Sequence, residues 1–325
     1  MKRIFSVILC VVLVLSLAAC GSNTIASVDN LKVDRGFFEY YFNQLKAQLE
    51  SELGEETWET AEYEGKSALD YAKERALQSA VEDVIVTERA KSEGIKFNND
   101  DIKSMGTLKN QWISYYGGED GFKKELEKYG ITTKQFDYML DAAYYKNHLI
   151  DKYTEASDEE ALNYYNDNIV KVKHILVLTV DPSTNAKLGE DEIVNAKQKI
   201  DRILQSAKNG EDFDSLVAEY TEDQDKFYYV GEGFALSDDG TESGKMVSEF
   251  ETAALALNPG EISDVVTSQY GYHIIKRYDN DDEMFENAKD TLISKVRQDK
   301  FTDILNEWKS KMKIVVNEDV YNSYK

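Results

Sequence analysis

Two strand-like runs, far apart in the chain, each carry a histidine followed by branched aliphatic residues. The first run is Val-Lys-His-Ile-Leu-Val at 172–177, and the second is Gln-Tyr-Gly-Tyr-His-Ile-Ile-Lys at 269–276. Short runs rich in Val, Ile and Tyr are typical of β-strands. The whole chain has three histidines, and two of them, His174 and His273, lie in these runs. We therefore predict that the two runs bound one folded unit.

The residues between these runs indicate the order of the elements in that unit. The spacing predicts a helix over about 191–206, ended by Asn-Gly at 209–210, and a short helix over 213–220. An irregular loop with Asp223 follows, and then a helix on which Met246 and Phe250 share a face. The result is a βααβαββ-like unit of about one hundred residues, which is a normal domain size.

Six segments of this unit together resemble the parvulin-type peptidyl-prolyl isomerases. Each segment alone is a weak signal, but their order and spacing match the family through the whole unit. They are His-Ile-Leu at 174–176, Asn-Gly-Glu-Asp-Phe at 209–213, Tyr-Thr-Glu-Asp at 220–223, Met-Val-Ser-Glu-Phe at 246–250, Asn-Pro-Gly-Glu-Ile-Ser at 258–263 and Tyr-Gly-Tyr-His-Ile-Ile at 270–275.

The resemblance implies a polar site made by His174, His273 and Asp223. The histidines would face each other across adjacent strands in a hydrogen-bonded network that fixes their tautomers. Asp223 stands where the family places a cysteine or an aspartate near the prolyl amide. Ser268, or Thr267 if the loop aligns one residue differently, would complete the network. The plain structural interpretation is a pair of satisfied core histidines and a loop-capping aspartate.

The resemblance also implies a proline pocket formed by Met246 and Phe250, for which the plain alternative is ordinary core packing. The family commonly has a Gly-Gly-Asp-Leu-Gly-Trp-Phe-like run after the aspartate, but this chain has Tyr-Val-Gly-Glu-Gly-Phe at 229–234. The leucine that helps to wall the pocket has no clear equivalent, and residues 237–245 form a longer loop than usual. Both the pocket shape and the turnover depend on this region.

Two functional hypotheses therefore stand. The first is a prolyl isomerase and foldase, which needs no cofactor and no metal because rotation about X-Pro breaks no bond. The second is a non-catalytic holdase whose parvulin-like block is a degenerate scaffold. A metal site at His174, Asp223 and His273 would compete with the histidine–histidine hydrogen bond. A Ser-His-Asp hydrolase is disfavoured because no nucleophile-elbow sequence is present.

Residues 1–20 have the pattern of a bacterial lipoprotein signal peptide. Lys2 and Arg3 precede an apolar stretch, and Leu-Ala-Ala-Cys at 17–20 resembles a lipobox. Cleavage before Cys20 would leave its sulfur to carry a lipid, so we expect a protein anchored on the extracytoplasmic face of the cell membrane. An ordinary signal peptide or a membrane stub is the alternative. With Cys10 removed and Cys20 acylated, no thiol remains for chemistry.

The remaining residues are predicted to be mainly helical and rich in Tyr and Phe. Residues 21–168 are similar to the amino-terminal chaperone region of SurA and PrsA-type foldases. Residues 280–325 add a long helix over 284–311 and a strand over 313–317, and neither can bury itself alone. We expect them to pack on the amino-terminal region, with residues 314–316 pairing near Val28. The sequence does not separate aromatic residues of the core from those of a client-binding crevice.

The predicted fold is therefore α+β. A discontinuous, mainly helical chaperone domain carries an inserted parvulin-like domain at 169–279, in which an antiparallel sheet is flanked by helices. The net charge of −23, or −25 without Lys2 and Arg3, excludes nucleic acid as a partner, since such binding needs clustered basic residues. The resemblance implies unfolded secreted proteins with X-Pro bonds as partners, and it leaves both a monomer and a homodimer open.

Overall fold

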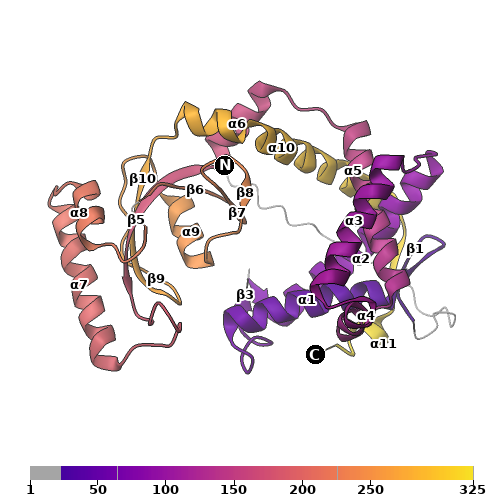
Figure 1. The fold of residues 1–325 in the computed structure, drawn as a ribbon, viewed down its shortest axis with the longest axis horizontal. Helices are drawn as coiled ribbons and strands as arrows, with labels where there is room; N and C mark the ends of the chain where they lie inside the picture. The colour runs from indigo at the N-terminus through magenta and orange to yellow at the C-terminus, as the bar shows by residue number, and fades with distance from the viewer. Residues whose placement is uncertain (1–22, 64, 225, 325) are drawn as a thin grey trace. The chain divides into compact units, whose positions relative to one another are not determined.

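The computed structural model describes residues 23–63, 65–224 and 226–324, which form two compact units. One unit contains the described residues up to Thr154 together with those from Lys300 onward. The other contains Glu155–Asp299. The sheet unit is thus inserted into a discontinuous helical unit (Figure 1), which confirms the predicted α+β layout.

The helical unit starts with two short antiparallel strands and continues as a series of helices. The predicted capping box of Thr132 and Gln135 starts α5, because each side chain accepts a backbone N–H of the other residue. The elements are β1 (Thr24–Val28), β2 (Leu31–Asp34), α1 (Arg35–Leu53), β3 (Glu62–Tyr63), β4 (Lys66–Ser67), α2 (Ala68–Ser92), α3 (Asn99–Tyr115), α4 (Glu119–Lys128), α5 (Thr133–Tyr153), the end of α10 (Asp282–Ser310), β11 (Ile314–Val316) and α11 (Glu318–Tyr321).

The sheet unit has one antiparallel sheet with the strand order β8-β7-β6-β5-β10-β9. The predicted strands and helices are present, but the single middle strand of the prediction is a run of three, because Gly233 at φ 78° lets the chain turn back between β6 and β7. The elements are α6 (Asp158–Asn168), β5 (Val170–Leu178), α7 (Glu190–Lys208), α8 (Phe213–Tyr220), β6 (Tyr228–Gly231), β7 (Phe234–Leu236), β8 (Glu242–Ser243), α9 (Ser248–Ala256), β9 (Val266–Thr267), β10 (Gly271–Tyr278) and the start of α10.

Helices cover both faces of this sheet (Figure 1). Because successive side chains of a strand point to opposite faces, Ile175 and Ile274 pack against α7 and α8. Val172 and Ile275 pack on the other face against Phe250 of α9. The central strands are buried on both sides, and this explains their nearly continuous apolar sequence.

The boundaries of the two units differ from the predicted ones at 168/169 and 279/280. Both α6 and the first half of α10 pack with the sheet unit, since Tyr165 of α6 and Phe285 and Leu292 of α10 share a buried cluster with Tyr229 of β6. Helical periodicity alone could not reveal this, because it shows that a helix has an apolar face but not which surface covers it.

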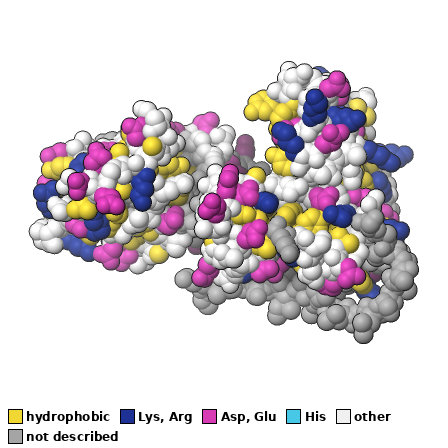
Figure 2. Space-filling view, turned by 90° about the horizontal axis from the view of Figure 1, so that it is seen from below, with side chains coloured by type: hydrophobic (Ala, Val, Ile, Leu, Met, Phe, Trp, Pro, Cys, Tyr) yellow, Lys and Arg dark blue, Asp and Glu magenta, His cyan; other side chains and the backbone are white. Residues whose placement is uncertain are grey.

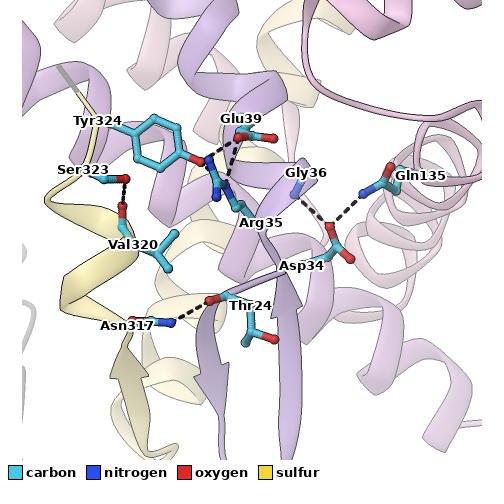
Figure 3. A network of polar contacts seen from close by, with 10 residues as sticks. All are labelled: Thr24, Asp34, Arg35, Gly36, Glu39, Gln135, Asn317, Val320, Ser323 and Tyr324. Atoms are coloured by element: carbon cyan, nitrogen blue, oxygen red, sulfur yellow. Dashed lines mark hydrogen bonds and ion pairs between the residues drawn. The ribbon is translucent and has the colours of Figure 1, made fainter. Parts of the chain in front are cut away.

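The last residues of the chain complete the helical unit. Strand β11 pairs with β1 in the predicted place, with Ile314 opposite Val28. After this strand, the Asn317 side chain donates to the Thr24 carbonyl oxygen at 3.1 Å (Figure 3). The Tyr324 hydroxyl accepts from Arg35 Nε at 2.6 Å and donates to Glu39 Oε1 at 2.8 Å. The first and the last described residues of the chain therefore belong to one unit.

We predict that the Tyr324 ring contributes more to stability than its hydroxyl. The ring packs edge-on against Phe38, with centroids 4.7 Å apart. We expect Tyr324→Ala to lower the free energy of unfolding by about 2 kcal/mol, and Tyr324→Phe to lower it by about 1 kcal/mol. Urea denaturation measures both, with Ser323→Ala as the neighbouring control. An unchanged urea midpoint for Tyr324→Ala would contradict this account of the carboxyl-terminal segment.

Candidate functional site

Two buried histidines lie at the centre of the sheet unit. In the β5–β10 register, Ile275 is opposite His174 and Leu176 is opposite His273. The histidines are therefore diagonal neighbours on the face that α9 covers. Their Nδ1 atoms are 3.2 Å apart, and the two residues are 5% and 4% exposed.

A glycine allows β10 to come this close to β5. Gly271 has a φ of 154°, and a Cβ built on it would lie 2.2 Å from the Val177 carbonyl oxygen. Any side chain at this position would push the strands apart where the histidines meet. The glycine of the Tyr-Gly-Tyr-His segment therefore has a direct role in positioning His273.

Hydrogen bonds continue from both histidines. His174 Nε2 lies 3.0 Å from Asp223 Oδ2, and His273 Nε2 lies 2.7 Å from Ser268 Oγ. The Ser268 hydroxyl also accepts the backbone N–H of Tyr270 at 3.1 Å. Of the two alternatives at the loop, Ser268 is the residue in contact with the histidine, while Thr267 is exposed on β9.

The network assigns one consistent set of tautomers to the neutral histidines. A carboxylate only accepts, so His174 donates from Nε2 to Asp223 and accepts at Nδ1. His273 then donates from Nδ1 to His174, and its Nε2 accepts the Ser268 hydroxyl proton. Every polar atom of the pair thus has one partner of the right kind, and the network orients all four side chains.

Asp223 is held in place by the loop that follows α8. The backbone N–H of Glu222 donates to the Leu176 carbonyl oxygen at 2.8 Å, and the Glu222 carboxylate accepts the N–H of Leu178 at 2.7 Å. The Thr221 hydroxyl accepts from the N–H of Leu176 at 3.2 Å. This loop is therefore fixed along β5, beside His174.

Hydrogen bonds and burial shift the pKa values of the site in different directions. The hydrogen bond from His174 holds the pKa of Asp223 well below its usual range. Burial, together with the neighbouring His174, lowers the pKa of His273 to about 3. Folded His273 thus binds fewer protons than unfolded His273 between about pH 3 and 6.5, so its contribution to stability decreases as the pH falls through this range.

An apolar wall lies against the histidines. Phe250 of α9 is 3% exposed, and its ring meets the rings of His174 and His273 edge-on at 5.0 and 5.5 Å. Met246 is partly buried in the same cluster, but it lies before the first residue of α9, Ser248, so the prediction that it shares a helical face with Phe250 was wrong. The structure therefore brings Phe250 to the polar network and places Met246 in the cluster of Phe250. Contact of either residue with a substrate stays a prediction.

Two residues of this site were missed by the sequence analysis. Val230 of β6 is fully buried in the cluster of Met246 and Phe250, so it supplies an aliphatic wall where no equivalent of the family's leucine was found. Tyr228 of β6 donates from its hydroxyl to Asp223 Oδ2 at 2.8 Å. The alternation of Tyr228 and Val230 along one strand was the available signal.

In the described ranges, no three His, Cys, Asp or Glu side chains are grouped so that they could hold a metal ion. At the site itself, both nitrogens of each histidine lie within hydrogen-bonding distance of a neighbour. A bound cation would have to replace these contacts.

Comparison with known proteins places this geometry in context. Residues 160–281 match the family model described as the PPIC-type PPIase domain, that is, a peptidyl-prolyl isomerase domain. The chain is 29% identical to the foldase protein PrsA of Caldanaerobacter subterraneus subsp. tengcongensis, over 94% of this chain and 92% of the relative. It is 28% identical to the foldase protein PrsA of Clostridium acetobutylicum, over 92% and 90%. The crystal structure of PrsA from Bacillus cereus matches with 25% identity and a TM-score of 0.30, covering 74% of this chain and 83% of that one.

We predict that His273 stays neutral in the folded protein down to about pH 4, because its pKa is lowered to about 3. Long-range ¹H–¹⁵N spectra of the imidazole groups would show the Nδ1–H tautomer for His273 and the Nε2–H tautomer for His174. The chain has three histidines, so the variants His148→Gln and His273→Gln assign the signals. Titration of His273 near pH 6.5 would contradict the assigned network.

Proposed function

Because the chain belongs to the PrsA-type parvulin foldases, we propose that it is a lipid-anchored extracytoplasmic peptidyl-prolyl isomerase and folding chaperone for secreted proteins. The single observation that carries the site assignment is the hydrogen-bonded row of Asp223, His174, His273 and Ser268 beside the Phe250 ring. A polar row next to an apolar wall matches the two parts of an X-Pro unit, the amide and the proline ring.

The reaction requires only that the free energy of the twisted amide be lowered relative to that of the planar amide. In the planar state the amide is charge-separated, with a partial negative charge on the carbonyl oxygen, and the barrier to rotation is about 18–20 kcal/mol. A fixed carboxylate near that oxygen disfavours the planar state, and an apolar wall that holds the proline ring lets the preceding carbonyl rotate. No bond is broken and no proton has to move.

Exposure separates the roles of the polar residues. The Asp223 side chain is 37% exposed, whereas that of His174 is 5% exposed. His273 and Ser268 are also buried. We therefore assign Asp223 as the catalytic residue that meets the substrate amide, and the three buried residues as the support that orients it.

Client binding is supported by a second feature, in the helical unit. A cavity of about 480 Å³ lies between α2 and the carboxyl-terminal elements. Its apolar lining residues are Leu77, Val81, Ile314 and Val316, and Tyr321 adds an aromatic surface. Charged and polar residues complete the lining, namely Lys66, Glu74, Gln78, Lys309 and Glu318. A cavity of this size, with an apolar wall and a polar rim, can take up side chains of an unfolded segment. If the isomerase site has no catalytic activity, this cavity favours the second candidate function, a holdase.

The proposed location at the cell membrane is inferred from the sequence alone. Cys20 and the rest of the signal pattern lie outside the described residues. Within the described part of the chain, none of the helices is both long and apolar enough to span a bilayer. The lipobox-like pattern supports an anchor at Cys20, and attachment by a lipid leaves both folded units outside the membrane.

The surface charge is more compatible with protein clients than with nucleic acid as the binding partner. On the face shown in Figure 2, Lys and Arg side chains lie scattered among Asp and Glu side chains. The net charge is −23. Such a surface repels phosphate backbones and keeps the protein soluble.

We expect Asp223→Ala and Phe250→Ala to remove most of the acceleration of cis–trans exchange in short X-Pro peptides. The aspartate variant should lower kcat/KM by at least about tenfold, and the phenylalanine variant should chiefly raise KM. Asp191→Ala, at an exposed position in the first turn of α7, is the control. A folded parent that gives no acceleration, yet prevents aggregation of an unfolded client, would replace the isomerase by the holdase.

We expect Cys20→Ser to abolish lipid attachment. In bacteria fed labelled palmitate, the parent should carry label and sediment with membranes, because cleavage before Cys20 exposes the sulfur for acylation. The variant should be unlabelled. A variant that still takes up label would place the anchor elsewhere.

A further inference from the structure

We propose that Tyr228 is a positioning residue of the isomerase site, acting through Asp223. The proposal rests on the proposed function, because it concerns the same reaction. Tyr228 lies at the start of β6 and pairs with Val172 of β5. That register places it diagonally across from His174, on the face that α9 covers.

Two contacts join Tyr228 to the polar row. Its hydroxyl donates to Asp223 Oδ2 at 2.8 Å, the same oxygen that His174 Nε2 approaches at 3.0 Å. Its ring meets the His174 ring edge-on, with centroids 5.2 Å apart. The phenol therefore covers the edge of the histidine and fixes the carboxylate that the histidine also holds.

These contacts give Asp223 one orientation. Donors at a common oxygen, from β5 and β6, stop the carboxylate from rotating, and a further backbone N–H from Gln224 binds the same group. The donors also keep the pKa of the Asp223 carboxyl well below its usual range. Burial, together with the hydrogen bond to Asp223, raises the pKa of the Tyr228 hydroxyl above its usual value. Across the working pH range the carboxylate stays charged and the phenol remains a donor.

The consequence for the reaction follows from the role of Asp223. A carboxylate that is free to turn spends part of its time away from the amide oxygen, and an oriented carboxylate does not. Loss of the Tyr228 hydroxyl should therefore lower kcat with little change in KM. It should also raise the pKa of Asp223, because one donor to the charged form is gone.

Tyr229 is a matched control for this effect. It follows Tyr228 in the same strand, and its hydroxyl donates to Asp281 Oδ2 at 2.7 Å. Asp281 lies outside the polar row, and Tyr229 packs in the cluster with Phe285. Tyr229→Phe thus removes the same kind of hydrogen bond, from a tyrosine to a carboxylate, at a distance from the reaction.

The test measures X-Pro isomerisation by the full-length protein in mild detergent, as a function of pH. We expect Tyr228→Phe to reduce kcat about tenfold, with KM nearly unchanged, at every pH at which the Asp223 carboxylate is charged. Tyr229→Phe should match the parent. In an Asp223→Asn background, Tyr228→Phe should have almost no further effect, because the residue acts through the carboxylate.

Two outcomes separate this inference from the proposed function. If the parent accelerates the reaction and Tyr228→Phe equals it in kcat and in pH profile, the inference alone fails. Additive effects of Tyr228→Phe and Asp223→Asn would also overturn it, since they would show a role independent of the carboxylate. If the parent gives no acceleration, the proposed function fails and this inference fails with it.

Discussion

The antiparallel pairing of β5 with β10 is the constraint on which the site depends. It runs from Lys171 opposite Tyr278 to Leu178 opposite Gly271 without a break in register. A slip of one residue would turn one histidine to the opposite face of the sheet and leave its partner buried without a hydrogen bond. The loop at Asp223 and the helix of Phe250 are then positioned by their packing on these two strands.

The sequence was informative wherever a residue pattern has one structural meaning. The paired histidine segments, the capping box at Thr132 and the pairing of Ile314 with Val28 all appear as predicted. The roles of Ser268, Met246 and Phe250 remain predictions, although the structure places Ser268 and Phe250 beside the histidines and Met246 in the cluster of Phe250. Local patterns and a clear end-to-end spacing were sufficient for these features.

Other features depend on non-local pairing, which periodicity does not reveal. Tyr228 and Val230 reach the site because β6 pairs with β5, and no local signal fixes that register. The sequence also did not show that α6 and the first half of α10 pack with the sheet unit, because either unit could have covered the apolar residues of these helices. Only the conformation of the turn before β10 shows that Ser268, and not Thr267, contacts His273. In each case the missing information was which surface meets which.

The closure of the helical unit by β11 affects the order in which the chain can fold. A protein is synthesised from its amino terminus, so the residues of the sheet unit, Glu155–Asp299, have all been made before Ile314–Val316. The first strand, β1, must wait with one edge unpaired until the last residues arrive and Asn317 and Tyr324 bind to it and to α1. The amino-terminal part of the helical unit therefore cannot complete its sheet until the carboxyl-terminal residues have been made.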